Sequence, residues 1–381
     1  MKNPFSFGVA VTGDSFCNRV QELSDLKKAV ESSRKFFIFG ERRLGKTSLL
    51  KKLMASLPQD DYIPVYIDIW KCISEDDFIR VCANAFALAC ETKTDKILSF
   101  AKEFFSFISP SITIDEAGKP VVVFGVIPKN HKTTLLEDVL SIPAKIAQKY
   151  PQKQVVVIFD EFPQIRSFES DRAERVLRSV IQHHEEVAYI FCGSRKHMIR
   201  EMFLNKTSPL YRSAAHYPVG YISINHWMPF IKEKFSNGGK TISDECIEKI
   251  YSETEGHPFY TQMLCSVCYE ISSKDLKEPL VVDEALEILF QRETHAFLSE
   301  WEALSSNEKK MVLALAKEKE IESPYSAEII QRHSLPPAST VQRTIKKLTD
   351  TDIIDRNEYG RYHITDKFFS RWIVKKMGSG N

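Results

Sequence analysis

The chain has 381 residues, which is too long for one ordinary hydrophobic core and predicts two or three domains. Its 52 basic side chains are almost balanced by 51 acidic ones, which excludes a protein that coats nucleic acid or an anionic membrane through net charge. No apolar run approaches the roughly 18 residues that a membrane span requires. We therefore expect a folded cytoplasmic protein without membrane contact.

Five runs rich in Val, Ile and Phe alternate with helical patterns. Continuous apolar strands that alternate with helices predict a parallel sheet covered on both faces, and hence an α/β fold. Between the second and third strands the pattern predicts helices at 76–90 and 96–107 and a β-hairpin at 111–126, which we interpret as an insertion at about 72–130. The strands are expected at 36–40, 63–70, 155–160, 188–194 and 217–223.

The pattern changes after residue 223 to helices only, and again near residue 305. The last part predicts three helices followed by two short strands around Glu358, Tyr359 and Gly360, which is the order of a winged helix-turn-helix. We therefore predict a core with the insertion at 1–223, a helical lid at 224–300 and a winged helix at 301–376.

A phosphate-binding loop is predicted directly after the first strand. The segment satisfies the pattern GxxxxGK[ST] and stands between a buried strand and a helix, which is the context that the pattern requires. Backbone amides of such a loop point at phosphate oxygens, Lys46 neutralises the terminal phosphates, and Thr47 can bind Mg²⁺. The predicted nucleotide-binding residues of this loop are Gly40, Glu41, Arg42, Arg43, Leu44, Gly45, Lys46, Thr47 and Ser48.

Polar residues follow the next strands of the predicted sheet. The run VVVIFDEF ends in Asp160, which we expect to hold Mg²⁺, and Glu161, which we expect to polarise the attacking water. Ser194, at the end of AYIFCGS, can hydrogen-bond the γ-phosphate or the water, or it can merely cap its strand. Arg212 is a candidate for stabilising the transferred phosphate, or a surface ion-pair residue.

These motifs, in this order, resemble P-loop ATPases of the AAA+ and STAND group, most closely the family described as ATPases predominantly of archaea. Besides GERRLGKTSLL and IFDEF, the resemblance rests on FCNRVQE, CGSR, PLYR, WMPFIKEKF and EGHPFY. It implies that Arg19 belongs to the nucleotide site and that Pro258 contacts the nucleotide from the lid. The sequence departs from the family at Val20, where an acidic residue is usual, and lacks the family's glycine before Arg212.

The predicted ligand is ATP with Mg²⁺, since the chain has no Asn-Lys-x-Asp motif for guanine. The sequence leaves three functions open. The first is a slowly hydrolysing, nucleotide-driven regulatory switch with a protein partner. The second, a DNA-transaction ATPase, is described in the next paragraph. The third is a nucleotide-binding module without hydrolysis.

The second is a DNA-transaction ATPase that contacts duplex DNA through Arg343, Lys346 and Lys347 in VQRTIKKL. Residues 301–376 hold 14 basic and 11 acidic side chains, so the basic footprint that DNA binding needs is small. The sequence does not decide the oligomeric state.

Overall fold

The computed structural model describes residues 3–11, 13–90, 97, 99–100, 103–104, 108–114, 120–126, 132–357 and 359–378, with only the backbone described at 108–114, 120–126 and 132–134. Its contacts divide the chain into two compact units. The first comprises residues 1–18, 42–44 and 221–381, and the second comprises residues 19–41 and 45–220. The predicted boundaries at 223 and 300 remain predictions.

The second unit is built on a five-stranded sheet in the order β2-β5-β6-β1-β7, in which all neighbours are parallel. Every residue of β6, and all of β5 after its first residue, is buried, as expected for inner strands covered on both faces. The parallel α/β prediction is therefore confirmed. The strands are β1 (Lys35–Phe39), β2 (Tyr62–Asp68), β5 (Gln154–Asp160), β6 (Val187–Gly193) and β7 (Ala215–Pro218).

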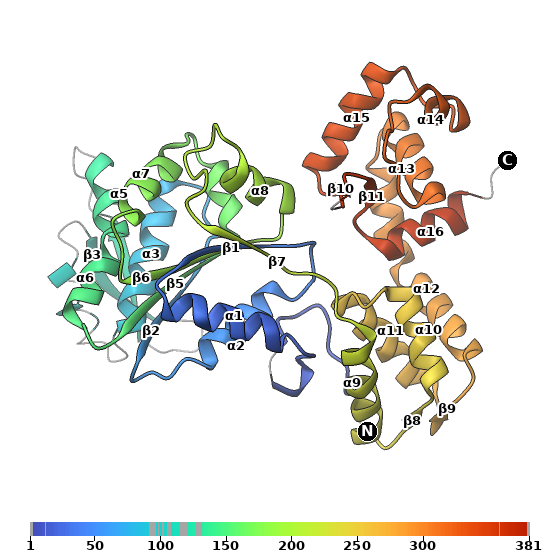
Figure 1. The fold of residues 1–381 in the computed structure, drawn as a ribbon, viewed down its shortest axis with the longest axis horizontal. Helices are drawn as coiled ribbons and strands as arrows, with labels where there is room; N and C mark the ends of the chain where they lie inside the picture. The colour runs from blue at the N-terminus through green and yellow to red at the C-terminus, as the bar shows by residue number, and fades with distance from the viewer. Residues whose placement is uncertain are drawn as a thin grey trace. The chain divides into compact units, whose positions relative to one another are not determined.

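Helices cover both faces of this sheet (Figure 1). Figure 1 shows α1 (Val20–Glu31) and α2 (Lys46–Ala55) along one face. The other face carries the main apolar core of the unit, where Phe37 of β1 stacks on Phe203 with ring centroids 4.6 Å apart. The helices of this core are α3 (Glu75–Cys90), α5 (Lys132–Leu140), α6 (Ile142–Lys149), α7 (Arg172–Ile181) and α8 (Lys196–Leu204), with a 3₁₀ turn, η2 (Phe162–Ser167), after β5.

The predicted hairpin is confirmed as an antiparallel pair, β3 (Ile108–Ile114) and β4 (Pro120–Val126). Most of the helix expected at 96–107, and the hairpin turn, lie outside the described residues. The fifth strand was expected at 217–223 but ends at Pro218. The amide of Val219 still donates to the carbonyl of Phe39 in β1 at 2.8 Å, and the chain then leaves the sheet, so that the amide of Ile222 donates to the carbonyl of Gly256 at 3.1 Å.

The first unit begins with a short 3₁₀ turn, η1 (Gly13–Ser15), and four helices lie between residue 221 and the winged helix. Ser243 caps α10 by accepting from the amide of Cys246. The prediction of helices only is wrong in one detail, because two short strands pair in parallel beside them. These elements are α9 (Ile224–Asn237), β8 (Thr241–Ile242), α10 (Asp244–Thr254), α11 (Pro258–Ile271), β9 (Asp275–Leu276) and α12 (Leu280–Glu302).

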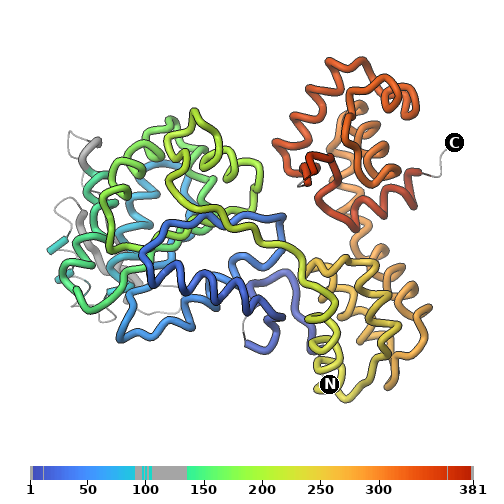
Figure 2. The backbone as a smooth tube through the Cα atoms, viewed as in Figure 1, coloured from blue at the N-terminus to red at the C-terminus, as the bar shows by residue number. Residues whose placement is uncertain are grey.

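The winged helix follows in the predicted order, and Figure 2 traces the chain from α12 into it. Ser305 and Glu308 form a reciprocal capping box that starts its first helix. A last helix was not predicted from the sequence, and it buries Phe368, Phe369 and Trp372. The elements are α13 (Ser306–Glu318), α14 (Ala327–Arg332), α15 (Ala338–Asp350), β10 (Ile354–Arg356), β11 (Tyr362–Ile364) and α16 (Lys367–Met377). Glu358, at the expected wing tip, lies outside the described residues.

None of the helices in the part of the chain that the structure describes is long and apolar enough to cross a membrane.

Candidate functional site

The loop between β1 and α2 has the backbone that a phosphate-binding loop requires. Gly45 adopts φ = 80° at the N-cap of α2, a left-handed conformation that glycine reaches without strain. Lys46 follows it with only 6% of its surface exposed, and its ammonium donates to the carbonyls of Gly40 at 3.0 Å and Glu41 at 2.6 Å. Burial lowers the pKa of Lys46. The lysine therefore lies inside the loop, next to the first amides of α2.

Asp160, the last residue of β5, is 3% exposed and accepts hydrogen bonds from three sides. The Thr47 hydroxyl donates to its Oδ2 at 2.8 Å, and the amide of Glu161 donates to its Oδ1 at 3.0 Å. The third donor is the Tyr66 hydroxyl on the neighbouring strand β2, 2.6 Å from Oδ2. The carboxylate is thus fixed beside the start of α2.

Tyr66 was missed at the sequence level. Burial raises its pKa, and the neighbouring Asp160 raises it further, so the hydroxyl stays protonated and donates. The sequence shows only that a tyrosine lies two residues before the end of β2, and it does not tell which strand pairs with β2. The register places Tyr66 opposite Ile158 and Asp68 opposite Asp160, which brings the phenol to the carboxyl edge of the sheet.

Glu161 and Ser194, predicted separately, are brought together by the pairing of β5 with β6. The Ser194 hydroxyl donates to Glu161 Oε2 at 2.8 Å, and its amide donates to the same oxygen at 3.3 Å. Glu161 has φ = 52°, so the chain turns sharply after the strand and directs this side chain toward the tip of β6. A non-glycine residue in this conformation carries backbone strain, which is common at functional sites.

These residues fit a nucleotide and Mg²⁺. The oxygens of Thr47 and Asp160 are the hard donors that Mg²⁺ prefers, and Mg²⁺ is usually held by one or two protein oxygens together with substrate phosphates. The amides at the start of α2 suit a phosphate. No cluster of three or more His, Cys, Asp or Glu that could hold a metal by itself occurs among the described residues.

Two other predicted residues do not join this group. Arg19 is buried, and its guanidinium donates to Glu22 Oε1 and to the carbonyl of Gly220, both at 2.7 Å. Arg212 is exposed, with its guanidinium 5.3 Å from the Tyr211 ring centroid. Arg212 precedes β7, which runs parallel to β1, so it lies near the amino ends of these strands. The phosphate loop of the same chain follows the carboxyl end of β1 and therefore lies at the opposite end of the sheet.

The loop residues 42–44 make their contacts within the first unit. Arg42 Nη2 lies 2.7 Å from Asp352 Oδ2, and Arg43 Nη1 lies 3.7 Å from Asp366 Oδ2, both carboxylates belonging to the winged helix. His257 Nε2 lies 3.2 Å from the carbonyl of Arg42, and a ring N–H there can donate to it. Pro258, which the family resemblance assigns to the nucleotide, follows His257 as the first residue of α11.

The basic residues predicted to contact DNA share one outward side of α15. Arg343, Lys346 and Lys347 are all exposed. The Lys347 ammonium already pairs with Glu308 Oε1 at 2.9 Å, so two of the three cations remain for a phosphate.

A family model described as an ATPase domain predominantly from Archaea matches residues 16–264. The chain belongs to this ATPase family. A second model, described as a probable winged helix domain, matches residues 295–375. The resemblance predicted from the motifs is therefore confirmed at the level of the family and of its C-terminal domain.

Two individual proteins are also similar to this chain, one in sequence and one in fold. The ATPase is 23% identical over 291 residues to an uncharacterised ATP-binding protein of Methanocaldococcus jannaschii, covering 70% of this chain and 72% of that protein. Its fold is similar to that of a Walker-type ATPase of Pyrococcus abyssi, with a TM-score of 0.67, 16% identity, and coverage of 97% of this chain and 99% of the other. The second likeness extends the shared fold to nearly the whole chain.

Proposed function

We propose that this ATPase hydrolyses ATP with Mg²⁺ and acts as a slow, nucleotide-driven regulatory switch of the STAND kind with a protein partner. The observation that carries the proposal is the pair Glu161 and Ser194 beside Asp160 and Thr47. A carboxylate at this place can polarise a water, and hydrolysis of a phosphoanhydride chiefly needs positioning and charge stabilisation.

Mg²⁺, when bound, would be held by Thr47 and Asp160 and would stabilise negative charge on the phosphates. Lys46 would add a positive charge inside the loop, and Tyr66 would keep the Asp160 carboxylate oriented. Glu161 would take the proton of the attacking water on its carboxylate. Because Ser194 donates twice to Oε2 of Glu161, this oxygen is already occupied and must exchange a hydrogen bond before it can accept from a water, which is the reason that we expect slow turnover.

The switch component is supported by the loop itself. Arg42 and Arg43 lie between the glycines that would surround the phosphates, and their side chains pair with Asp352 and Asp366 of the winged helix. A nucleotide that reshapes the loop would alter these ion pairs, so the winged helix can respond to the phosphate state.

Glu161→Gln tests hydrolysis. The variant keeps the shape of the side chain but cannot take up a proton, so we expect phosphate release to fall by about 100-fold or more while ATP binding is retained. Lys46→Ala should weaken nucleotide binding itself and serves as the binding-deficient control. Equal phosphate release by wild type and Glu161→Gln would rule out the assigned base, and no release by wild type would favour a nucleotide-binding module.

The switch is tested separately by hydrogen exchange of Glu161→Gln in ATP and in ADP, both with Mg²⁺. We expect exchange around Asp352 and Asp366 to differ between the two nucleotides. Identical exchange patterns would contradict the switch while leaving hydrolysis intact.

Duplex DNA is a second candidate partner, because Arg343 and Lys346 are exposed on one side of α15. A double variant, Arg343→Ala with Lys346→Ala, should weaken salt-sensitive duplex binding and reduce its salt dependence. Absence of duplex binding by wild type at low salt would eliminate this candidate.

A further inference from the structure

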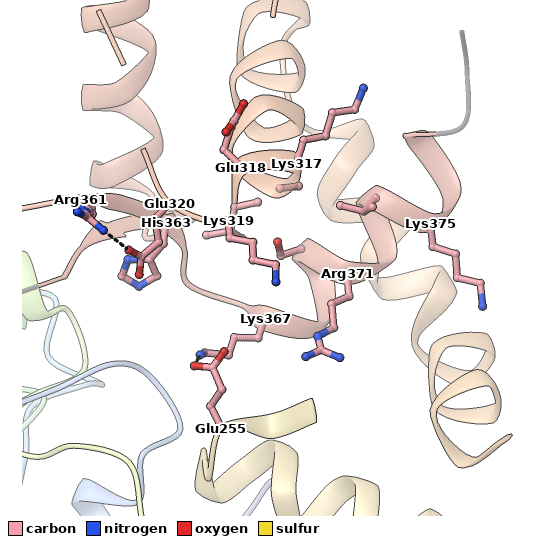
Figure 3. A pocket seen from close by; sticks show the side chains of 14 residues that line it. Glu255, Lys317, Glu318, Lys319, Glu320, Arg361, His363, Lys367, Arg371 and Lys375 are labelled. Atoms are coloured by element: carbon pink, nitrogen blue, oxygen red, sulfur yellow. Dashed lines mark hydrogen bonds and ion pairs between the residues drawn. The ribbon is translucent and has the colours of Figure 1, made fainter. Parts of the chain in front are cut away.

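A cleft lined with basic residues lies in the first unit, apart from the exposed side of α15. It encloses about 840 Å³ between the end of α13, β11 and α16, with Glu255 of the lid at its margin (Figure 3). A volume of this size is typical of small-molecule sites. The cationic cleft, as we name it, is lined by Lys317, Lys319, Arg361, Lys367, Arg371 and Lys375.

One wall of the cationic cleft is a row of three cations on α16. Lys367, Arg371 and Lys375 recur every fourth residue, so they share one face of the helix at intervals of about 6 Å along its axis. Each of them pairs with a carboxylate of the lid helices: Lys367 with Glu255, Arg371 with Glu253, and Lys375 with Glu287. The positive charge of this wall is therefore partly compensated.

The opposite wall is different, because its two lysines have no such partners. Lys317 and Lys319 make no ion pair or hydrogen bond with any residue that the structure describes, and both are exposed. Figure 3 shows Lys319 extending from the end of α13 toward Arg371. Neighbouring carboxylates do not compensate these ammoniums, since Glu318 pairs with Arg332 and His333, and Glu320 with Arg361.

The backbone of Lys319 gives a second reason to regard this wall as functional. Its φ of 65° and ψ of −47° are strained for any residue with a Cβ, and glycine is the usual choice just after a helix. A lysine in this conformation costs stability and places a charged side chain over the cleft. Strain of this kind is concentrated at binding sites.

We propose that the cationic cleft binds a small polyanion that carries at least two phosphate groups. The ammonium of Lys319 extends toward Arg371, and Lys317 on the same wall adds a second uncompensated charge although its side chain points away from Arg371 (Figure 3). The guanidinium of Arg371 has a planar fork that suits a phosphate oxygen pair, which would compete with Glu253 for it. The described residues lining the cleft include no Phe, Tyr or Trp, and His363 is their one aromatic side chain, so the cleft lacks the row of aromatic platforms on which successive bases of a nucleic-acid strand stack. Binding at this site does not depend on hydrolysis in the phosphate loop.

The test is calorimetric titration of the full chain with inorganic tripolyphosphate at low salt in EDTA. All proteins carry Lys46→Ala, which removes the main phosphate-binding cation of the ATP site. We expect a single site whose affinity falls by about tenfold when Lys317→Gln and Lys319→Gln are added, because the charge-assisted contact of Lys319 and the neighbouring positive charge of Lys317 are lost. The matched control, Lys274→Gln with Lys310→Gln, removes the same charge from exposed lysines outside the cleft and should change affinity by less than about twofold.

Two outcomes would overturn the proposal directly. The first is an equal loss of tripolyphosphate affinity in both double variants, which would mean diffuse charge attraction. The second is no measurable binding of tripolyphosphate by the Lys46→Ala parent. A labelled single-stranded oligonucleotide provides the last arm. If it binds more tightly than tripolyphosphate and loses that binding in the Lys317→Gln, Lys319→Gln variant, the cleft serves a nucleic-acid strand, and a small polyanion is the wrong ligand.

Discussion

Replacing Tyr66 by phenylalanine removes the hydroxyl that donates to Asp160 Oδ2 at 2.6 Å and leaves the ring in place. Asp160 is 3% exposed, so water cannot readily replace the lost donor. The Thr47 hydroxyl and the Glu161 amide remain, and they hold the carboxylate by two hydrogen bonds instead of three. We expect a carboxylate that binds Mg²⁺ less well because it is less firmly oriented.

The size of the effect follows from the geometry. Loss of a partner that orients a metal-binding group typically costs 10–100-fold in metal affinity, and the partial exposure of Tyr66 puts the expected loss at the lower end, about tenfold. A hydrogen bond to a charged group contributes about 1.5–3 kcal/mol, which we reduce to about 1–2 kcal/mol for a half-buried donor. The melting temperature should therefore fall by roughly 2–8 °C.

The assay is phosphate release at saturating ATP, titrated with free Mg²⁺. Tyr66→Phe should raise the Mg²⁺ midpoint about tenfold and approach wild-type turnover at high Mg²⁺. Tyr62→Phe is the matched control, since Tyr62 lies on the same strand and its hydroxyl has no hydrogen bond to any described residue. If the Mg²⁺ midpoints and melting temperatures of the two variants agree, the hydroxyl of Tyr66 does not support the metal site.

Two further predictions concern the hydroxyl of Thr47 and two glycines with a left-handed backbone. Thr47→Ala should abolish Mg²⁺-dependent turnover and Thr47→Ser should restore most of it, because both the serine and threonine hydroxyls can bind Mg²⁺; equal loss in both variants would contradict this. Gly256→Ala places a Cβ 2.0 Å from the Ile222 carbonyl at φ = 77°, whereas Gly360→Ala, at φ = 80°, meets nothing within 4 Å. Thermal unfolding should show a loss of about 1–2 kcal/mol for Gly360→Ala, the cost of the left-handed backbone, and a clearly larger loss for Gly256→Ala; similar losses would refute the clash.

Burial, assisted by the nearby Lys35, lowers the pKa of His184 from 6.5 to about 4. The unfolded chain therefore takes up this proton first, and stability present above pH 6.5 should be lost as the pH falls toward 4. Denaturant unfolding across this range should show a shallower decline for His184→Gln, and an unchanged decline would refute the assignment.

Much of this protein could be predicted from local patterns. The loop around Lys46 and the acidic end of β5 were recognisable because a glycine-rich turn and a terminal carboxylate each act through residues adjacent in sequence. Apolar strands alternating with helices predicted the parallel sheet, because burial on both faces leaves a continuous hydrophobic run. The last helix, α16, was not predicted because only two residues separate it from the wing, although one of them, Asp366, caps the helix by accepting from the amides of Phe368 and Phe369.

What the sequence by itself determined is thus the fold class, the phosphate loop and the family of this ATPase, since these depend on short motifs and on periodicity. Only the tertiary structure decided which side chains meet. Strand order and register bring Tyr66 to Asp160 and Ser194 to Glu161, and helix packing places Lys319 opposite Arg371. Such pairings join residues far apart in the chain, and their geometry depends on how the strands and helices pack, which no local pattern records.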